Sequence, residues 1–326
     1  MKQAFKPELE LASALELEPG PDGLGPAQAA KDKDSGQTKK ATQSARSWSR
    51  AYREENPYLR RTLIALSLIF TALMLIMPLL VVISQAFGTG WDRFWKAVTD
   101  LFTLKALYLT AITTVSAVTA NTVFGLAAAW ALSRYRFKGQ GFLITLIDLP
   151  FAISPIIAGL IFILTYGRLG WAHSFLDEHN IKIVFATPGI IMATIFVTIP
   201  FVARELIPVL TARGSDEEQA AVLMGAGFFR VFFQVTFPHI KWALLYSVIL
   251  CAARAMGEFG AVSVVSGHLR GKTNTLPLHI EILYNEHHYN EAFAVSAILV
   301  FTAIIILTAR SVVEKVSKRE ERSGLH

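Results

Sequence analysis

The sequence predicts an all-α polytopic membrane protein with six transmembrane helices. Hydrophobic residues make up 53% of the 326-residue chain and charged residues 17%, whereas soluble domains carry about 25% charged residues. Six apolar runs are long enough to cross about 30 Å of hydrocarbon, which takes roughly 20 helical residues. Backbone polar groups inside a bilayer must be paired within the protein, so we expect these runs to be helices. The runs span residues 62–87, 107–132, 141–166, 186–210, 241–266 and 292–314.

The first 57 residues differ from the rest of the chain. They are rich in Glu, Lys, Pro, Gly, Ser and Ala, and aromatic residues are almost absent before Trp48. Such a segment buries too little apolar surface to offset its ordering entropy, which predicts a disordered tail. It lacks the short apolar core of a secretory signal peptide.

Basic residues in the short loops predict the orientation of the chain. SRYRFKGQG (133–141) and the C-terminal tail (316–326) are both basic, so the positive-inside rule places them, and the N-terminal tail, in the cytoplasm. This accounts for the net charge of +6 without a nucleic-acid partner, because no basic face on a soluble domain is visible. The permease domain then covers 58–315. The loops 88–106, 167–185 and 267–291 face outward, and the loop 211–240 faces inward.

The inner loop contains the stretch SDEEQAAVLMGAGFFRVFFQVTFPHI, residues 215–240. Ser215 or Asp216 is expected to cap a helix with an acidic first turn. Gly225 and Gly227 permit a sharp turn, and a second short helix, closed by Pro238, follows. Two short helices at a glycine turn predict a rigid knob that docks another protein. The alternative, an amphipathic helix lying on lipid, is disfavoured by its acidic start.

Ionisable residues inside the fifth apolar run are candidates for function. Arg254 and Glu258 are four residues apart, so they can pair on one helical face. Either the pair locks the helix into the bundle, or Arg254 borders an anion path together with Ser263 and Ser266, since guanidinium offers five hydrogen-bond donors. The spacing leaves both interpretations open, and Glu258 is expected to be paired or to face away from an anion.

Weaker candidates lie in the third and fourth runs, where prolines free backbone groups that can line a cavity. Asp148 precedes Pro150, and Arg204 and Glu205 lie between Pro200 and Pro208. For each of these charged residues, helix packing is the simpler role. Asn121, in the second run, is expected to form an interhelical hydrogen bond.

The sequence contains no convincing motif for ATP hydrolysis, intramembrane catalysis or metal binding. GHLRGKT (267–273) has three residues between its glycines where a phosphate-binding loop needs four, so this chain is not expected to be an ATPase. Neither a nucleophile–base pair nor a metal triad at helical spacing appears, which argues against an intramembrane enzyme. His287 and His288 indicate a solvated loop, and no metal site or bound cofactor is predicted.

The inner loop resembles the cytoplasmic EAA loop of ABC-importer permeases. That motif is EAA, three residues, Gly, nine residues, Ile, one residue and Leu-Pro, and every spacing is present here. The departure is Gln219, which stands where the motif has glutamate, although Glu218 is adjacent. The resemblance implies a coupling helix that seats in a separate ATPase, which binds ATP and Mg. The residues it implies in coupling are Glu218, Gln219, Ala220, Ala221, Gly225, Phe228, Phe232 and Pro238.

A second resemblance narrows the substrate. ARAMGEFGAVSVVSG (253–267) is similar to the RAxGEFGA signature of sulfate and molybdate permeases. IDLPFAISPIIAGL (147–160), LDEHNI (176–181), TIFVTIPFVARELIPV (194–209) and SVVSGHLRGKTNTLPLHIEIL (263–283) resemble the W-type permeases of sulfate/thiosulfate importers. This implies a bacterial inner-membrane subunit that moves sulfate or thiosulfate by alternating access.

The implied partners are a T-type sister permease, two ATPase subunits and a periplasmic sulfate-binding protein. A molybdate or tungstate permease of the same family is the main alternative, because RAMGEFGA is shared. A stand-alone secondary anion transporter is a weaker alternative, since no inverted repeat is visible across the six runs.

Overall fold

The computed structural model describes residues 57–323, so the predicted tail lies, except for its last residue, outside the described part of the chain. The chain divides into two compact units, Met1–Ile76 and Met77–His326. In the first unit, α3 (Pro57–Thr71) and the π-helical η1 (Ala72–Ile76) follow one another. Both are strongly apolar, as expected for part of a membrane span.

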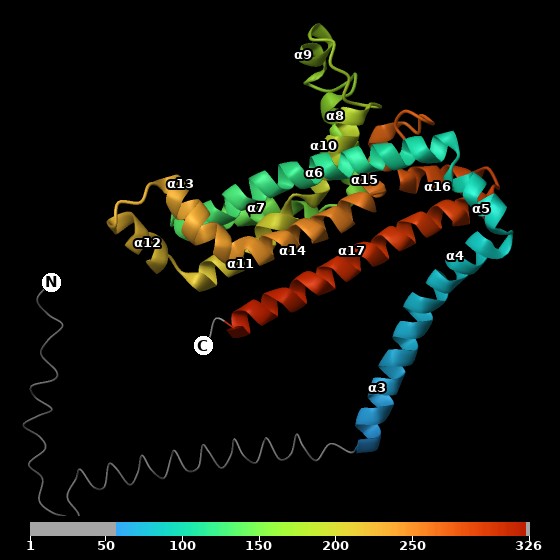
Figure 1. Cartoon of the computed structure of the whole chain (residues 1–326). Coiled ribbons are helices and arrows are strands. Elements are labelled where there is room, and N and C mark those ends of the chain that lie inside the picture. Colours follow the sequence, from blue (N-terminus) through green and yellow to red (C-terminus); the bar gives the residue numbers. More distant parts are fainter. Residues whose placement is uncertain (1–56, 324–326) are drawn as a thin grey trace, which may run out of the picture. The chain divides into compact units, whose positions relative to one another are not determined.

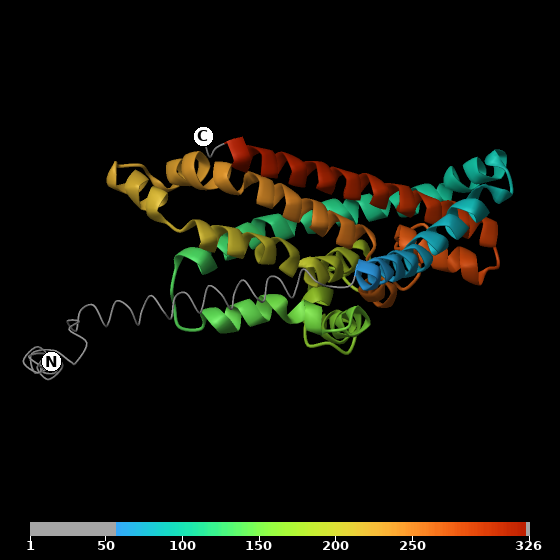
Figure 2. The same ribbon diagram turned by 90° about the horizontal axis from the view of Figure 1, so that it is seen from below.

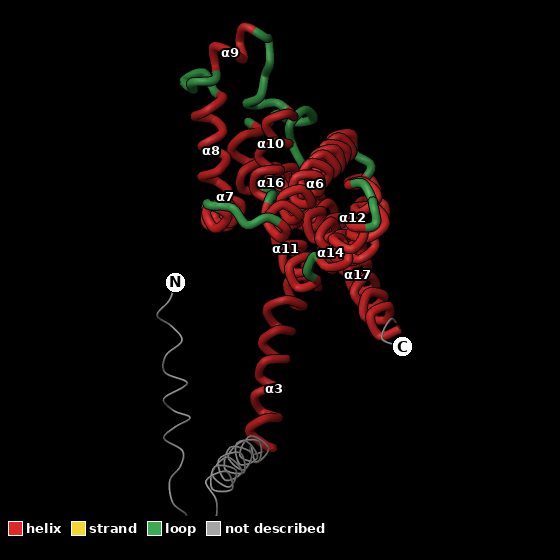
Figure 3. Tube along the Cα trace, turned by 90° about the vertical axis from the view of Figure 1, so that its left-hand side faces the viewer, coloured by secondary structure: helices red, strands yellow, loops and turns green. Residues whose placement is uncertain are grey.

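All regular secondary structure among the described residues of the second unit is helical, which confirms the predicted all-α class (Figures 1 and 3). Its first half contains α4 (Met77–Gly88), α5 (Trp91–Val98), α6 (Leu101–Arg134), α7 (Gln140–Ala152), α8 (Pro155–Tyr166) and α9 (His173–Glu178). Its second half contains α10 (Thr187–Thr198), α11 (Pro200–Arg213), α12 (Asp216–Leu223), α13 (Phe228–Val231), the π-helical η2 (Phe232–Thr236), α14 (Phe237–Met256), α15 (Gly260–Ser266), α16 (Leu276–Asn285) and α17 (Tyr289–Ser323).

Five described helices are long and apolar enough to cross a membrane, and a sixth crossing is possible if α7 and α8 count as one span. The five are Tyr58–Gly88, Leu101–Arg134, Thr187–Arg213, Phe228–Met256 and Tyr289–Ser317. The run predicted as a span over 141–166 is instead broken, with a bend of 105° between α7 and α8. Ser154 has a ψ of 133° at the break. The following Pro155 disfavours helical dihedrals at that residue, which explains why the helix stops there.

The run predicted as a span over 241–266 is also interrupted. Helix α14 ends at Met256, and α15 begins at Gly260. The Glu258 side chain accepts a hydrogen bond of 2.9 Å from the Ala261 N–H, so it satisfies one free donor of the new helix. The two broken runs meet, because a Cβ on Gly260 would lie 2.9 Å from the Cβ of Pro155.

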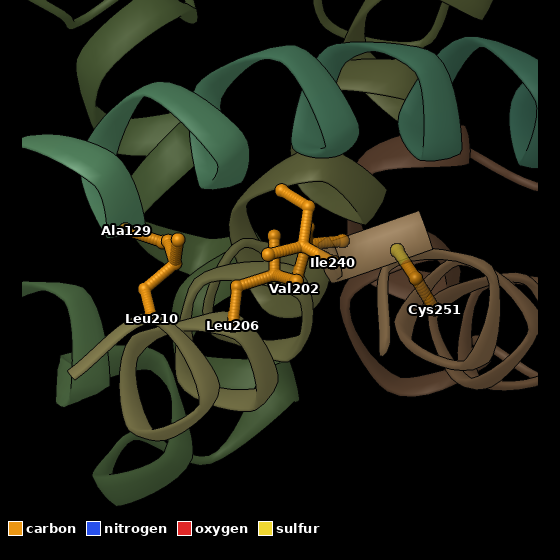
Figure 4. Close-up of a cluster of buried hydrophobic side chains, with 6 residues drawn as sticks. All are labelled: Ala129, Val202, Leu206, Leu210, Ile240 and Cys251. Atoms are coloured by element: carbon orange, nitrogen blue, oxygen red, sulfur yellow. The ribbon is translucent and has the colours of Figure 1, made fainter. Parts of the chain in front are cut away.

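Helix α6 is the centre of the second unit and packs against α10, α11, α14 and α16 (Figure 1). Helix α17 lies alongside α14 and α4 (Figure 2). Gly125 lets α6 approach α11 closely, since a Cβ there would lie 2.7 Å from the Cβ of Val202. Figure 4 shows the buried hydrophobic cluster formed by α6, α11 and α14. Its members are Ala129 of α6, Val202, Leu206 and Leu210 of α11, and Ile240 and Cys251 of α14.

Buried polar side chains of α6 tie it to its neighbours. The Asn121 amide donates to the Thr198 hydroxyl at 2.7 Å, which confirms the predicted interhelical hydrogen bond. The Thr110 hydroxyl accepts from the Leu276 N–H at 2.7 Å. Thr103 lies 3.2 Å from the His279 ring, and burial lowers the pKa of that histidine. The neutral imidazole is therefore favoured at this contact.

Close packing at Gly159 generates a stability prediction. A Cβ there would lie 2.6 Å from the Ala261 carbonyl oxygen, and backbone cannot yield easily. We expect Gly159→Ala to destabilise the protein by about 1–3 kcal/mol, the usual cost of overpacking. The matched control is Gly141→Ala on α7, where a Cβ would meet nothing within 4 Å. This change should be neutral or stabilise by roughly 0.5–1 kcal/mol. Thermal unfolding in detergent measures both, and equal midpoints would contradict the close contact.

Candidate functional site

The segment 211–240 folds into a hairpin whose turn is a Schellman motif. At the end of α12, the Ala226 N–H donates to the Ala221 carbonyl at 3.0 Å and the Gly225 N–H to the Val222 carbonyl at 2.9 Å. Gly225 has a φ of +85°, the left-handed conformation that this motif requires and that glycine adopts without strain. The sharp turn predicted from the glycines is therefore present, with a defined hydrogen-bond pattern.

The second arm of the hairpin differs from the prediction. Helix α13, η2 and α14 form one continuous helix from Phe228 to Met256, so Pro238 does not close a short helix. The Phe237 N–H bonds to the Phe232 carbonyl, the wider spacing of a π turn. This turn comes directly before Pro238, which has no N–H to give to an α-helical bond. The first span has the same arrangement, with η1 ending just before Pro78.

Glu218 braces the base of the hairpin. Its carboxylate accepts hydrogen bonds of 2.8 Å from Arg134, at the end of α6, and 2.7 Å from Thr236, in η2. Arg134 also donates to the Leu210 carbonyl at 2.9 Å. The Arg134 and Glu218 side chains are only 9% and 13% exposed. Glu218 therefore joins four helices and is turned inward, while the neighbouring Gln219 is exposed and bonds to the Ser215 hydroxyl at 2.7 Å.

Apolar side chains form an exposed rim around the turn. Leu223, Met224 and Phe229 are 88%, 82% and 74% exposed. Val222, Phe228 and Phe233 complete the rim. Of the residues singled out in the sequence, Ala220, Gly225, Phe228 and Pro238 are exposed, Phe232 is half-buried and Ala221 is buried. Leu223, Met224 and Phe229 are not among the residues predicted to dock, although three consecutive apolar residues before a glycine turn were a usable signal.

The Arg254–Glu258 pair lies at the break in the fifth run. The two side chains approach to 2.5 Å; Glu258 is buried and Arg254 is 33% exposed. The prediction that Glu258 is paired is confirmed. Ser266 is buried and accepts from the His268 N–H, and Ser263 donates to the Gly260 carbonyl. The Ser263 hydroxyl thus bonds within its own helix, and the Ser266 hydroxyl bonds to the loop that follows it.

Asp148 and Arg204 face one another across α7 and α11. Their charged atoms are 4.0 Å apart, and both line a cavity of about 140 Å³ together with Ile144, Ile147, Ile207 and Pro208. The Arg204 guanidinium also lies 5.3 Å from the centre of the Phe151 ring. Glu205, half-buried, does not line this cavity. Across residues 57–323 we find no group of three or more His, Cys, Asp or Glu placed to hold a metal ion.

Most of the chain matches a known protein family. Residues 121–322, which include the hairpin, both charged pairs and α17, match the family described as "Binding-protein-dependent transport system inner membrane component". The chain belongs to this family. It is accordingly a membrane component of a transport system, and the family description assigns its members to the inner membrane.

Relatives of this permease carry more specific names. It is 44% identical over 262 residues to "Sulfate transport system permease protein CysW" of Escherichia coli K12, covering 80% of this chain and 90% of that one. The protein of the same name from Synechocystis is 45% identical over 81% and 94% of the two chains. "Sulfate transport system permease protein CysT" of Salmonella typhimurium is 35% identical over 74% and 87%.

Solved structures share the fold of this permease. A bacterial ABC transporter described as importing the acidic polysaccharide alginate superposes with a TM-score of 0.67. The match covers 84% of this chain and 99% of that chain at 15% sequence identity. The permease fold expected from the EAA-like spacing is therefore confirmed.

The brace at Glu218 generates a prediction about the hairpin. We expect Glu218→Ala to lower the free energy of local opening over 216–226 by about 1.5–3 kcal/mol, the usual contribution of hydrogen bonds to charged groups. Hydrogen exchange of these amides measures the change. Gln219→Ala, one residue away on the exposed side, should change it by less than about 0.5 kcal/mol. Equal effects of the two substitutions would show that the ion pair does not hold the hairpin.

Proposed function

We propose that this chain is a membrane-spanning subunit of an ATP-driven importer that moves sulfate and thiosulfate by alternating access. The observation that carries the proposal is the braced hairpin with its exposed apolar rim. It lies within the part of the chain that matches the transport family. The substrate follows from the relatives, which are named for sulfate transport and align over most of their length.

The hairpin is proposed to seat in a cytoplasmic ATPase. Leaving side chains such as Leu223, Met224 and Phe229 in water is unfavourable by roughly 25 cal/mol per Å² of apolar surface, so a protein partner that covers them gains binding energy. The brace at Glu218 limits the motion of the hairpin relative to α6 and α11. A push on the rim would therefore be transmitted to the membrane helices. ATP and Mg belong to two ATPase subunits in this proposal.

Partly exposed charges on the membrane helices support a sister permease. Arg204 is 62% exposed and Asp148 39% exposed. Charges facing lipid cost several kcal/mol each, whereas charges facing a second subunit or a water-filled path do not. We propose that a T-type permease covers this side. Arg254, exposed in part beside the break at Gly257, would then offer donors to an oxyanion, while Glu258 stays paired and buried.

The proposed orientation has both termini and the hairpin in the cytoplasm. The outer loops would receive the anion from a periplasmic sulfate-binding protein. This orientation is supported by the basic residues of 133–141 and of α17 beyond Arg310. Molybdate or tungstate is the second candidate substrate, because the Gly257-Glu258-Phe259-Gly260 break falls in the signature that the two permease classes share.

Uptake of labelled sulfate tests the substrate. In a strain without another sulfate system, deletion of this gene should abolish uptake, and restoring the gene should recover it. Unlabelled thiosulfate in excess should compete strongly and molybdate weakly. Unchanged sulfate uptake in the deletion strain, together with loss of molybdate uptake, would reassign the substrate while leaving the transport family intact.

Substitution of Gly225 tests the coupling role. A side chain at this position points into open space, since a Cβ would meet nothing within 4 Å. We expect Gly225→Trp to leave the protein in the membrane, to abolish co-purification of the ATPase and to reduce uptake at least tenfold.

Gly225→Ala is the matched control, because it carries the same strain at φ +85° without the bulk. It should retain most uptake. If the tryptophan variant transports normally, the hairpin is not the ATPase contact; if the alanine variant fails equally, backbone strain and not blocked docking explains the loss.

A further inference from the structure

Helix α5 lies where three membrane-length helices reach the same surface. It begins three residues after α4 ends at Gly88, and it ends three residues before α6 starts at Leu101. It also packs against the first turns of α17. Because long apolar helices begin or end at each of these points, α5 is positioned at a boundary between hydrocarbon and water.

One face of α5 is fixed to the bundle. Phe94 and Ala97 are buried against Ala86 of α4 and Ala294 and Ala297 of α17. Since the helix has eight residues and this face is held, the directions of its other side chains are set. Two flanks remain outside the contact, and they differ in chemistry.

The first flank is aromatic. Trp91 and Trp95, one helical turn apart, are 65% and 55% exposed. Trp91 is held in place by its neighbours: its ring stacks on Phe87 with centroids 5.7 Å apart and planes within 6°, and it lies 5.4 Å from Phe94. Phe87 belongs to the last turn of the first span. The exposed indoles are therefore level with the end of an apolar helix.

The second flank is polar. Lys96 forms an exposed ion pair of 2.8 Å with Asp92. Arg93 and Lys96 line an open cavity of about 550 Å³ with Asp100 and with Glu291 of α17. Charged side chains favour water, whereas the exposed indoles of the first flank favour a less polar environment. The two flanks of α5 therefore suit different environments.

We propose that α5 is an interfacial anchor that binds phospholipid. Trp91 and Trp95 lie in the boundary between headgroups and acyl chains, and the charged flank faces the aqueous side. Indole suits this layer because its ring is apolar and its N–H finds hydrogen-bond acceptors among the headgroups. A short amphipathic helix with tryptophans on one side and charges on the other is a usual form of such an anchor.

The anchor has a mechanical role. Because α5 packs on both α4 and α17, holding it at the interface fixes the depth of these two helices in the bilayer while others move. In the proposed orientation of the importer α5 lies in the outer leaflet, and this assignment rests on the proposed function. The lipid contact itself does not depend on the substrate.

Spin-label accessibility tests the anchor in the assembled transporter. Trp95→Cys and Lys96→Cys are each introduced into an otherwise cysteine-free complex, with Cys251 replaced by Ala, labelled in detergent and reconstituted into liposomes. Collision rates with oxygen, which concentrates in lipid, and with a water-soluble nickel chelate are then compared. We expect the ratio of the oxygen collision rate to the chelate collision rate to be severalfold higher for the label at position 95 than for the label at position 96. Trp91→Cys gives a second reading of the same flank.

Each alternative has a distinct result. Chelate access at position 95 equal to that at position 96 would place the aromatic flank in water and overturn the proposal. Low access of both reagents at position 95 would mean that a protein subunit covers it, which also overturns the lipid contact. Co-purification of the other subunits with the labelled chain confirms assembly. A transporter of another anion would give the same accessibility pattern, so failure of the substrate assignment is recognised separately.

Discussion

Satisfaction of backbone hydrogen bonds inside a bilayer is the constraint on which the rest of this structure depends. It makes every long apolar run helical, and it allows a helix to break only where the freed groups are covered by protein or line a water-filled cavity. Two runs do break, near Ser154 and near Gly257, and the breaks face one another through Pro155 and Gly260. The Glu258 carboxylate accepts a hydrogen bond from one of the freed N–H groups, that of Ala261. The two interruptions therefore lie against each other, and a side chain at one of them replaces a lost backbone partner.

Small residues allow the helices to pack closely against one another. Gly125 brings α6 against α11, and Gly159 brings α8 against α15. Without a hydrophobic driving force between helices in lipid, close approach and interhelical hydrogen bonds such as that of Asn121 provide the association energy. The buried ion pair between Arg134 and Glu218 then extends this rigid packing to the hairpin outside the membrane helices.

The sequence predicted the class, the positions of the apolar runs and the turn at Gly225, because these follow from composition, length and the special conformations of glycine. It placed Glu218 in coupling but could not show that the carboxylate is turned inward, since its partner Arg134 is 84 residues away. The continuity of the helix through Pro238 was missed for another reason: proline ordinarily ends a helix, and the π turn that accommodates it has no recognised sequence signal.

The unbroken helix from Phe228 to Met256 has a mechanical consequence. Its 29 residues form a lever about 43 Å long at 1.5 Å per residue. One end carries the aromatic residues of the rim, and the other ends at the break around Gly257. A tilt of about 10° about the hairpin end would move the far end of the helix by roughly 8 Å at that length, more than the pitch of about 5.4 Å of one helical turn. A modest rotation at the hairpin thus becomes a displacement of several ångströms at the end of the helix that carries Arg254.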